Sequence, residues 1–144
     1  MTADALPRST LQVRVYYEDT DAGGVVFYAN YLKFLERART EWLRALGINQ
    51  STMAVTEQRL FVVRSLDMDY RKPARLDDLL TIHSEITKLG RASIHFAQHA
   101  ERDGELLVSG SIQICCVDAV NLRPAALPPT LVDVLRANLR DLRE

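Results

Sequence analysis

The segment NYLKFLERARTEWLRAL, residues 30–46, decides how this chain folds. Its apolar residues recur every three or four positions, a spacing typical of an amphipathic helix that buries one face. This stripe consists of Tyr31, Leu32, Leu35, Ala38, Trp42, Leu43 and Leu46. Charged residues occupy the opposite side, and Gly47 is a suitable left-handed end for the helix. We therefore expect one long helix whose stripe forms the core beneath a sheet.

Most of the remaining chain is predicted to be β-strand. Residues 11–18 alternate apolar and polar side chains, as a half-buried strand does. A short helix is expected after Ser51. Four more strands are predicted at 60–70, 79–89, 92–101 and 106–117.

Turn signals indicate how the later strands connect. Gly90 ends one strand, and the pair Asp103-Gly104 is typical of a two-residue hairpin. A terminal helix is expected over 130–142, behind two prolines. Helices do not alternate with strands, which argues against a doubly wound parallel sheet. The predicted fold class is α+β, with an antiparallel sheet curled against one amphipathic helix.

The composition indicates a single globular domain. The chain has 144 residues, of which 47% are hydrophobic, enough for a substantial core. Its net charge of -1 argues against a nucleic-acid-binding protein that depends on a basic surface. No apolar run approaches the roughly 18 residues of a transmembrane helix, and MTADALPRST at the start does not resemble a signal peptide. We expect a flexible lead-in over 1–10, one domain over 11–144, and a cytoplasmic protein.

The cysteines and histidines do not indicate a metal site. Adjacent strand residues point to opposite faces, so Cys115 and Cys116 are poorly placed to bridge each other and are interpreted as apolar sheet residues. A reactive thiol is the alternative. His95 and His99 share a strand face, but they lie about 13 Å apart at the rise of a strand, too far to bind one ion. Neither Cys-x-x-Cys nor His-Glu-x-x-His occurs, so no metal ligands are predicted.

The turn DTDAGG, from Asp19 to Gly24, has the chemically most informative composition. A solvated turn is one interpretation, because Asp and Gly are common turn residues. A calcium loop is disfavoured because Asn30 occupies the position that needs a bidentate Glu. An Asp-x-Asp phosphatase is disfavoured because its fold is doubly wound. The third interpretation is catalysis, since a carboxylate here faces a helix N-terminus whose N–H groups can stabilise an oxyanion.

Longer motifs resemble a known family. YEDTD at 17–21, GVVFY at 24–28 and ERARTEWLR at 36–44 closely resemble acyl-CoA thioesterases of the hotdog fold, in particular the Tol-Pal-associated branch of the 4-hydroxybenzoyl-CoA thioesterase family. The likeness covers about 13–129. It implies a five-stranded antiparallel sheet wrapped around one long helix, followed by a C-terminal helix. It also implies dimers whose sheets join edge to edge, often paired into tetramers, with the active site at the dimer interface.

The resemblance also implies roles for individual residues. Asp21 matches the catalytic carboxylate, acting as a nucleophile or a general base. Tyr28, seven positions later, matches the helix-start residue whose backbone N–H polarises the thioester carbonyl. Many relatives have histidine there, so only the backbone role is carried over to this chain. Asp19 and Glu18 are interpreted as supports of the turn.

Binding of coenzyme A requires cations for its phosphate groups. Arg91, just after Gly90, matches a basic position that contacts the nucleotide in relatives. Arg64, Lys72 and Arg75 are further candidates, for which an ordinary solvated charge is an equal interpretation. No metal or redox cofactor is implied, because CoA belongs to the substrate.

The sequence therefore predicts an acyl-CoA thioesterase that acts as a homodimer or homotetramer and releases a carboxylic acid and free CoA. The alternative is a non-catalytic hotdog module that binds acyl-CoA or an acyl carrier protein within the envelope or division machinery. A peripheral position at the inner membrane is compatible with that link. The presence of Asp21 favours the enzyme, whereas the sequence does not distinguish aliphatic from aromatic acyl groups.

Overall fold

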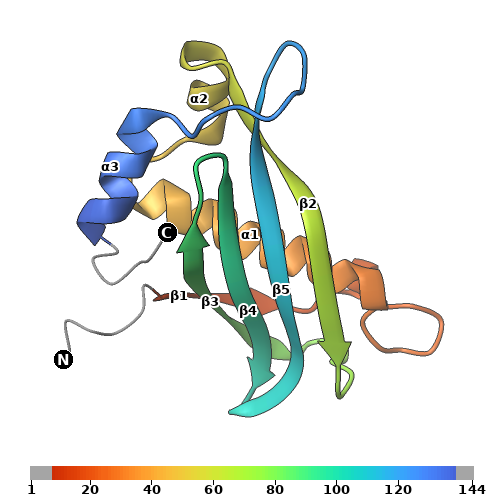
Figure 1. Ribbon diagram of the computed structural model, residues 1–144. Coiled ribbons are helices and arrows are strands. Elements are labelled where there is room, and N and C mark those ends of the chain that lie inside the picture. The colour runs from red at the N-terminus through yellow and green to blue at the C-terminus, as the bar shows by residue number, and fades with distance from the viewer. Residues whose placement is uncertain (1–7, 139–144) are drawn as a thin grey trace.

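The computed structural model describes residues 8–138 and contains one antiparallel sheet of five strands in the order β1-β3-β4-β5-β2 (Figure 1). The strands are β1 (Arg8–Arg14), β2 (Arg59–Tyr70), β3 (Leu79–Leu89), β4 (Ser93–Arg102) and β5 (Glu105–Asp118). The helices are α1 (Tyr31–Ala45), α2 (Gln50–Thr56) and α3 (Pro129–Asn138), and two 3₁₀ turns are η1 (Tyr17–Asp19) and η2 (Tyr28–Asn30). This is the predicted hotdog architecture.

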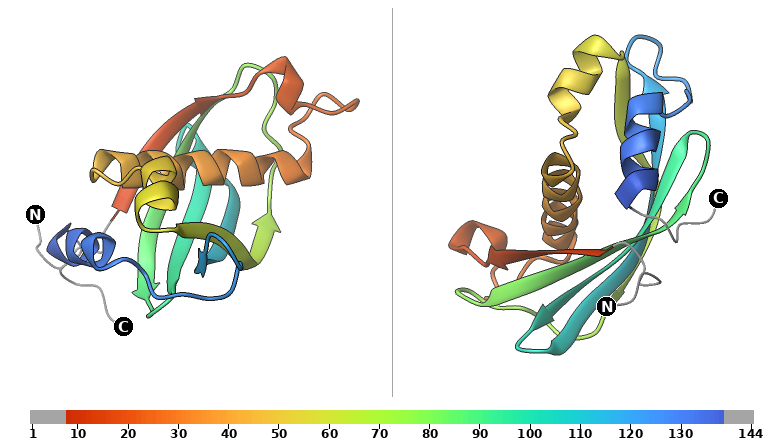
Figure 2. Two further views of the ribbon diagram at one scale, coloured as in Figure 1. Left: turned by 90° about the horizontal axis from the view of Figure 1, so that it is seen from above. Right: turned by 90° about the vertical axis from the view of Figure 1, so that its left-hand side faces the viewer.

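Helix α1 lies across the concave face of the curled sheet, and α3 lies on the same side (Figure 2). Strand residues alternate between this face and the outer face, so every second side chain of β3 and β4 is buried over most of each strand. Phe34, Leu35 and Leu43 of α1 are almost completely buried in the resulting core. Trp42 packs edge-on against Phe96, with ring centroids 6.2 Å apart. The predicted core beneath the sheet is confirmed, with Phe34 as an addition that the helical stripe did not include.

A buried polar contact also joins α1 to the sheet. Arg39 and Gln98 are only 8% and 2% exposed, and the Arg39 Nη1 donates to Gln98 Oε1 over 2.9 Å. The amide nitrogen of Gln98 donates to the carbonyl of Leu35 and to the hydroxyl of Ser84. Burial lowers the pKa of Arg39, and the negative charge of Glu36 partly opposes this. One side chain of β4 therefore satisfies a buried cation and two polar groups.

The first strand begins and ends earlier than the sequence predicts. Residues 8–10 belong to β1 rather than to a flexible lead-in, because Arg8 pairs with Glu85 in the ladder and through an ion pair of 3.3 Å. Residues 1–7 lie outside the described part of the chain. At the other end, the strand stops at Arg14, and the following residues tighten into η1. As a result Tyr17, which continues the apolar positions of the alternating pattern, is 82% exposed.

Other connections follow the sequence signals closely. Asp103 and Gly104 have φ values of 52° and 82° and form the two-residue hairpin predicted between β4 and β5. The short helix expected after Ser51 is present as α2, which begins at Gln50. Helix α3 covers the first part of the predicted terminal helix, whose positions beyond 138 lie outside the described residues. Across 8–138, every helix is too short or too polar to cross a lipid bilayer.

Replacing Gln98 with leucine is expected to lower the free energy of unfolding by about 2–4 kcal/mol, although leucine is the more apolar residue. The physical reason is that the Arg39 cation and the Ser84 hydroxyl then lose their buried partner. Urea denaturation measures the change. Gln12→Leu on the exposed side of β1 is the matched control, expected within about 0.5 kcal/mol of wild type. Equal stability of the two variants would show that the buried contact is dispensable.

Candidate active site

The loop between β1 and α1 projects beyond the helix, at the right of Figure 1. A bridge between Thr20 and Val26 closes the loop, and the Asp21 N–H donates to the Val25 carbonyl over 2.9 Å. Gly24 has a φ of 80°, a left-handed conformation that favours glycine. The Val26 N–H donates to the carbonyl of Ala74, which attaches the loop to the segment that follows β2. The predicted turn is therefore a small, hydrogen-bonded hairpin.

Asp19 fixes this loop to the start of α1. The carboxylate is buried, and its two oxygens accept from the Tyr16 N–H and from the Asn30 side chain, each over 2.8 Å. Its backbone carbonyl accepts from the Phe27 N–H over 3.0 Å. Asn30 directly precedes α1, so Asp19 connects both ends of the loop to the helix. The structure thus gives Asp19 a supporting role. Glu18, by contrast, is exposed and has no hydrogen bond or ion pair with any described residue.

Asp21 presents one oriented and one open carboxylate oxygen. The side chain is exposed, and Oδ1 accepts from the Gly23 N–H over 2.8 Å. A Cβ at position 23 would lie 3.3 Å from that oxygen, so glycine leaves room for the contact. Within the described part of the chain, Oδ2 has no hydrogen-bond partner. An exposed carboxylate held in this way can deprotonate water or attack a carbonyl carbon.

Tyr28 lies where the sequence places it, at the beginning of the helix. It is the first residue of η2, which runs directly into α1. No described atom accepts a hydrogen bond from the Tyr28 N–H, as is usual for the first N–H groups of a helix. The positive end of the α1 dipole lies at the same place. This N–H is therefore available to an oxygen that carries developing negative charge.

A small cavity of about 230 Å³ lies beside Tyr28. It is lined by Val26, Tyr28, Tyr31, Tyr70, Arg71, Lys72 and Pro73. The rings of Tyr28 and Tyr70 meet edge-on, with centroids 6.1 Å apart. The Tyr31 hydroxyl accepts from the Ala74 N–H over 3.0 Å, and burial raises its pKa although this bond opposes the shift. Asp21 does not line this cavity within one chain.

Tyr70 is a site residue that sequence reasoning missed. The sequence indicates only that it is the last residue of the strand predicted over 60–70. Its contact with Tyr28 depends on where β2 ends relative to η2, and 42 positions of sequence separate the two residues. No local pattern in the sequence signals such a contact.

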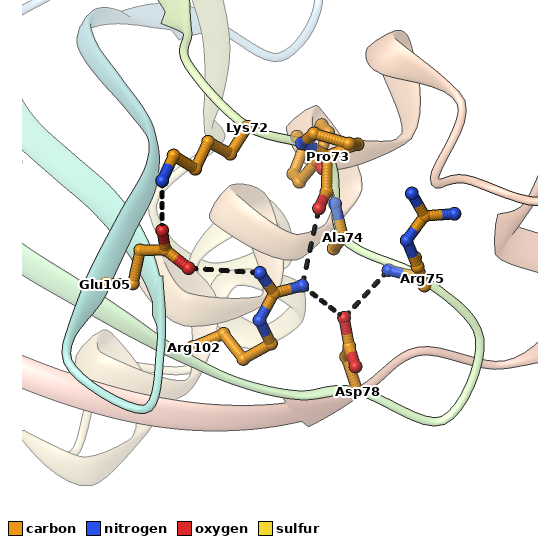
Figure 3. Close-up of polar contacts among 8 residues, drawn as sticks. Lys72, Pro73, Ala74, Arg75, Asp78, Arg102 and Glu105 are labelled. Atoms are coloured by element: carbon orange, nitrogen blue, oxygen red, sulfur yellow. Dashed lines mark hydrogen bonds and ion pairs between the residues drawn. The ribbon is translucent and has the colours of Figure 1, made fainter.

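Lys72 lines the cavity, and Arg75 lies three residues further along the same segment. Figure 3 shows both residues beside a charged network. Arg102 donates to Asp78 Oδ2 over 2.7 Å and to Glu105 over 3.1 Å, and Lys72 also pairs with Glu105. Lys72 is thus engaged by an acid of its own chain. The Arg75 N–H donates to Asp78, whereas its guanidinium points away from the network in Figure 3. Arg75 is the more available of the two cations.

The other two predicted cations lie elsewhere. Arg64 is the extra residue of a β-bulge in the middle of β2, between Val63 and Ser65. Arg91 is exposed in the turn after β3, whereas the Asp21 loop lies near the start of that strand. The 11 residues of β3 span roughly 35 Å at 3.3 Å per residue. A single chain therefore does not bring Arg91 to Asp21.

The structure also brings together a group of potential metal ligands that the sequence did not reveal. In the described part of the chain, one group could hold an ion, and it consists of His83, His99 and Glu101. The spacing along one predicted strand relates only His95 to His99. The pairing of His83 with His99 depends on the register of β3 against β4, which the sequence does not display.

Comparisons with known proteins agree with the fold and the motifs. The family description "Thioesterase superfamily" matches residues 23–109. The chain is 47% identical over 116 residues to the acyl-CoA thioesterase YbgC of Haemophilus influenzae, covering 81% of this chain and 85% of that protein. It is 46% identical over 121 residues to the acyl-CoA thioester hydrolase YbgC of Escherichia coli O157:H7, covering 83% and 90%.

A solved structure of a relative has a similar fold. The probable thioesterase from Bartonella henselae superimposes with a TM-score of 0.80 at 36% identity, covering 84% of this chain and 99% of that one. The chain belongs to the thioesterase superfamily, and the predicted resemblance to hotdog thioesterases is confirmed. Membership of the Tol-Pal-associated branch stays a prediction.

Replacing Asp19 with asparagine is expected to lower the free energy of unfolding by about 1–3 kcal/mol, because an amide NH₂ would face a buried N–H donor. Chemical denaturation measures this loss. Glu18→Gln, the neighbouring exposed acid, serves as control and is expected to change stability by less than about 0.5 kcal/mol. If Asp19→Asn is as stable as Glu18→Gln, the loop does not depend on the buried carboxylate.

Replacing Arg102 with methionine is expected to cost about 1–2 kcal/mol at pH 7, through loss of its partly buried bond to Asp78. Burial raises the pKa of Asp78, but the Arg102 hydrogen bond and other contacts outweigh this, so the net shift is downward. The stabilisation is therefore complete above the unfolded-state value of about 3.9 and lost as pH falls through the lower folded-state pKa.

Urea titrations at several pH values test this dependence. The difference between wild type and Arg102→Met should be constant near neutrality and shrink below about pH 4. Arg71→Met removes the exposed ion pair with Asp69 and is expected to have little effect. A difference that stays constant down to pH 2–3, roughly one unit or more below the unfolded-state value, would contradict the role of Asp78.

Proposed function

We propose that this protein is an acyl-CoA thioesterase that hydrolyses acyl-CoA to a carboxylic acid and free CoA, with Asp21 as the catalytic carboxylate. One observation carries the proposal. The same loop holds an exposed carboxylate with an open oxygen and leads to a helix-start N–H, that of Tyr28, without an acceptor. The relatives named as acyl-CoA thioesterases support the substrate class.

The chemistry requires two groups to act on one thioester. The Tyr28 N–H donates to the carbonyl oxygen and stabilises the negative charge that develops there. Asp21 then follows one of two routes. It attacks the carbonyl carbon, which expels CoA as a thiolate and leaves a mixed anhydride for water to hydrolyse, or it takes a proton from the water that attacks. In both routes the thiolate finally gains a proton, and the products are the acid and CoA.

The proposed unit is a homodimer joined through β2. This strand is an edge of the sheet, and it exposes Val62, Val63 and Leu66 by 43%, 48% and 41%. Exposed apolar edges of this length favour pairing with another strand. The homotetramer expected from the resemblance would need a further contact between two such dimers.

Twofold pairing of β2 explains how distant residues of the sequence share one site. Antiparallel partners place the Tyr70 end of one strand beside the Arg59 end of the other. Arg59 donates to the carbonyl of Ala126, and the next residue, Leu127, donates to the carbonyl of Arg91. The Arg91 turn thus lies at the Arg59 end. Pairing therefore brings Arg91 of one chain toward the Asp21 loop of the other.

In this arrangement the phosphates of CoA are bound by cations from both chains. Arg91 is exposed and supplies a planar, bidentate donor group from one chain. Arg75 of the other chain forms a β-bridge with Val25 of that same chain, so it lies beside the Asp21 loop. Lys72 contributes less because Glu105 already pairs with it. A cytoplasmic location, peripheral attachment at the inner membrane and recognition of an acyl carrier protein are further parts of the proposal.

Asp21→Asn is expected to lower kcat by about 10²–10⁴-fold, because it removes the charged base or nucleophile while keeping the shape. Thiol release from a panel of acyl-CoA and acyl carrier protein thioesters measures turnover. Glu18→Gln, three residues away and exposed, is the control and should retain wild-type rates. Wild-type turnover by Asp21→Asn would refute the catalytic assignment. Tight binding without turnover by the wild type would instead indicate a non-catalytic module.

Arg91→Ala is expected to raise KM for acyl-CoA with little change in kcat, because a phosphate contact is similar in the ground and transition states. Thioesters of N-acetylcysteamine lack the nucleotide and should be insensitive. Equal losses with both substrates would show that Arg91 does not bind the nucleotide.

Mixing the Asp21→Asn and Arg91→Ala variants, each impaired at low substrate concentration, tests whether the site is shared. In a dimer of one Asp21→Asn chain and one Arg91→Ala chain, one site retains both native residues and the other retains neither. Random re-association should therefore restore about a quarter of the wild-type sites, by twofold symmetry. Activity is measured well below KM, with each variant re-associated alone as control. Activity no higher than the average of the two separate variants would show that Asp21 of one chain and Arg91 of the other do not share a site.

A further inference from the structure

Two histidines stack on the outer face of the sheet, which faces away from α1. His83 of β3 and His99 of β4 are direct register partners. Their rings lie nearly parallel, at 12°, with centroids 4.5 Å apart. Both side chains alternate with buried neighbours and are themselves only partly buried. Neither belongs to the core or to the Asp21 loop.

A carboxylate faces both imidazole rings. His83 Nε2 lies 3.0 Å from Glu101 Oε1, and His99 Nε2 lies 3.2 Å from Glu101 Oε2. One nitrogen of each ring and the carboxylate thus converge, and the candidate ligand atoms of the three residues all lie within 4.8 Å of one another. Their side chains are 29–38% exposed, so solvent reaches the cluster.

We propose that His83, His99 and Glu101 bind one divalent transition-metal ion, for which Zn²⁺ is a suitable representative. Two imidazole nitrogens and one carboxylate oxygen suit zinc and its neighbours, whereas Mg²⁺ and Ca²⁺ prefer all-oxygen ligands. Zinc binds such atoms at about 2.0–2.2 Å, so small side-chain rotations suffice to bring the three atoms onto one ion.

The surroundings leave the ion accessible from solvent. A cavity of about 540 Å³ lies on the same face and is lined in part by His83, His99, Ser109 and Asp69. Three protein ligands leave a fourth position for water, and the cavity provides an entry path. Because the cluster bridges β3 and β4, a bound ion would link these strands. It would take no part in thioester hydrolysis, which the proposed function places at the Asp21 loop.

Binding is tested with untagged protein by equilibrium dialysis against Zn²⁺, followed by measurement of zinc per chain. Wild type should bind one ion, and its melting temperature should rise with zinc concentration. His83→Gln, His99→Gln and Glu101→Gln should each weaken zinc affinity by roughly 10–100-fold or more. Losing even a residue that only hydrogen-bonds a metal ligand typically weakens affinity on this scale. The matched control is His95→Gln, which removes the third histidine, on the same face of β4, and should retain the ion.

A second measurement on wild type does not depend on variant folding. In proton NMR spectra, zinc should shift the ring signals of two of the three histidines and leave that of His95 unchanged. Substitution with Co²⁺ should give visible bands of nitrogen and oxygen ligation. A thiolate charge-transfer band would place the ion at Cys115 or Cys116 instead. That band, a shift confined to His95, or equal zinc binding by wild type and His99→Gln would overturn the proposal.

Discussion

The position of the candidate site depends on one buried carboxylate, that of Asp19. Its two oxygens hold the backbone before η1 and the amide of Asn30, and its carbonyl holds Phe27. These bonds place the exposed Asp21 and the start of the helix within one hydrogen-bonded loop. The helix is in turn fixed by its packing in the curled sheet and by the contact between Arg39 and Gln98. A mobile loop could not keep a carboxylate and an N–H in the fixed relation that catalysis needs.

The second constraint is the shape of a single chain. Its Asp21 loop lies at one end of β3 and Arg91 at the other, and its edge strand β2 exposes apolar side chains. The proposed twofold dimer would account for both features, because it would cover the edge strand and bring opposite ends of two chains together. The bulge at Arg64 lies in the middle of that edge. Assembly and activity are therefore linked in this account.

The sequence predicted what depends on local pattern. The helical period of 30–46, the alternation along the strands and the Asp103-Gly104 hairpin are each determined by neighbouring residues, and each is present. The predicted end of the first strand was wrong. The alternation of apolar and polar residues continues to position 18, but the chain leaves the ladder at Arg14 and then forms η1. Residue-level roles for Asp21 and Tyr28 came from the resemblance, because their separate residue types fit an ordinary turn equally well.

Contacts between distant segments were not predictable from the sequence. Arg39 lies buried against Gln98, Tyr70 meets Tyr28, and Glu105 engages Lys72. Each depends on strand register or on where an element ends, and a single sequence encodes neither directly. The contact with Glu105 also makes Lys72 a weaker candidate for phosphate binding, because its charge is already paired within its own chain.

The most direct measurement of the central claim is a crystal structure of the Asp21→Asn variant with an intact acyl-CoA. The thioester carbonyl oxygen should lie about 2.7–3.1 Å from the backbone nitrogen of Tyr28. The side chain at position 21 should lie beside the carbonyl carbon, with the nucleotide near Arg91 of the partner chain. A thioester bound away from Tyr28, with position 21 facing solvent, would show that this loop is not the site of hydrolysis.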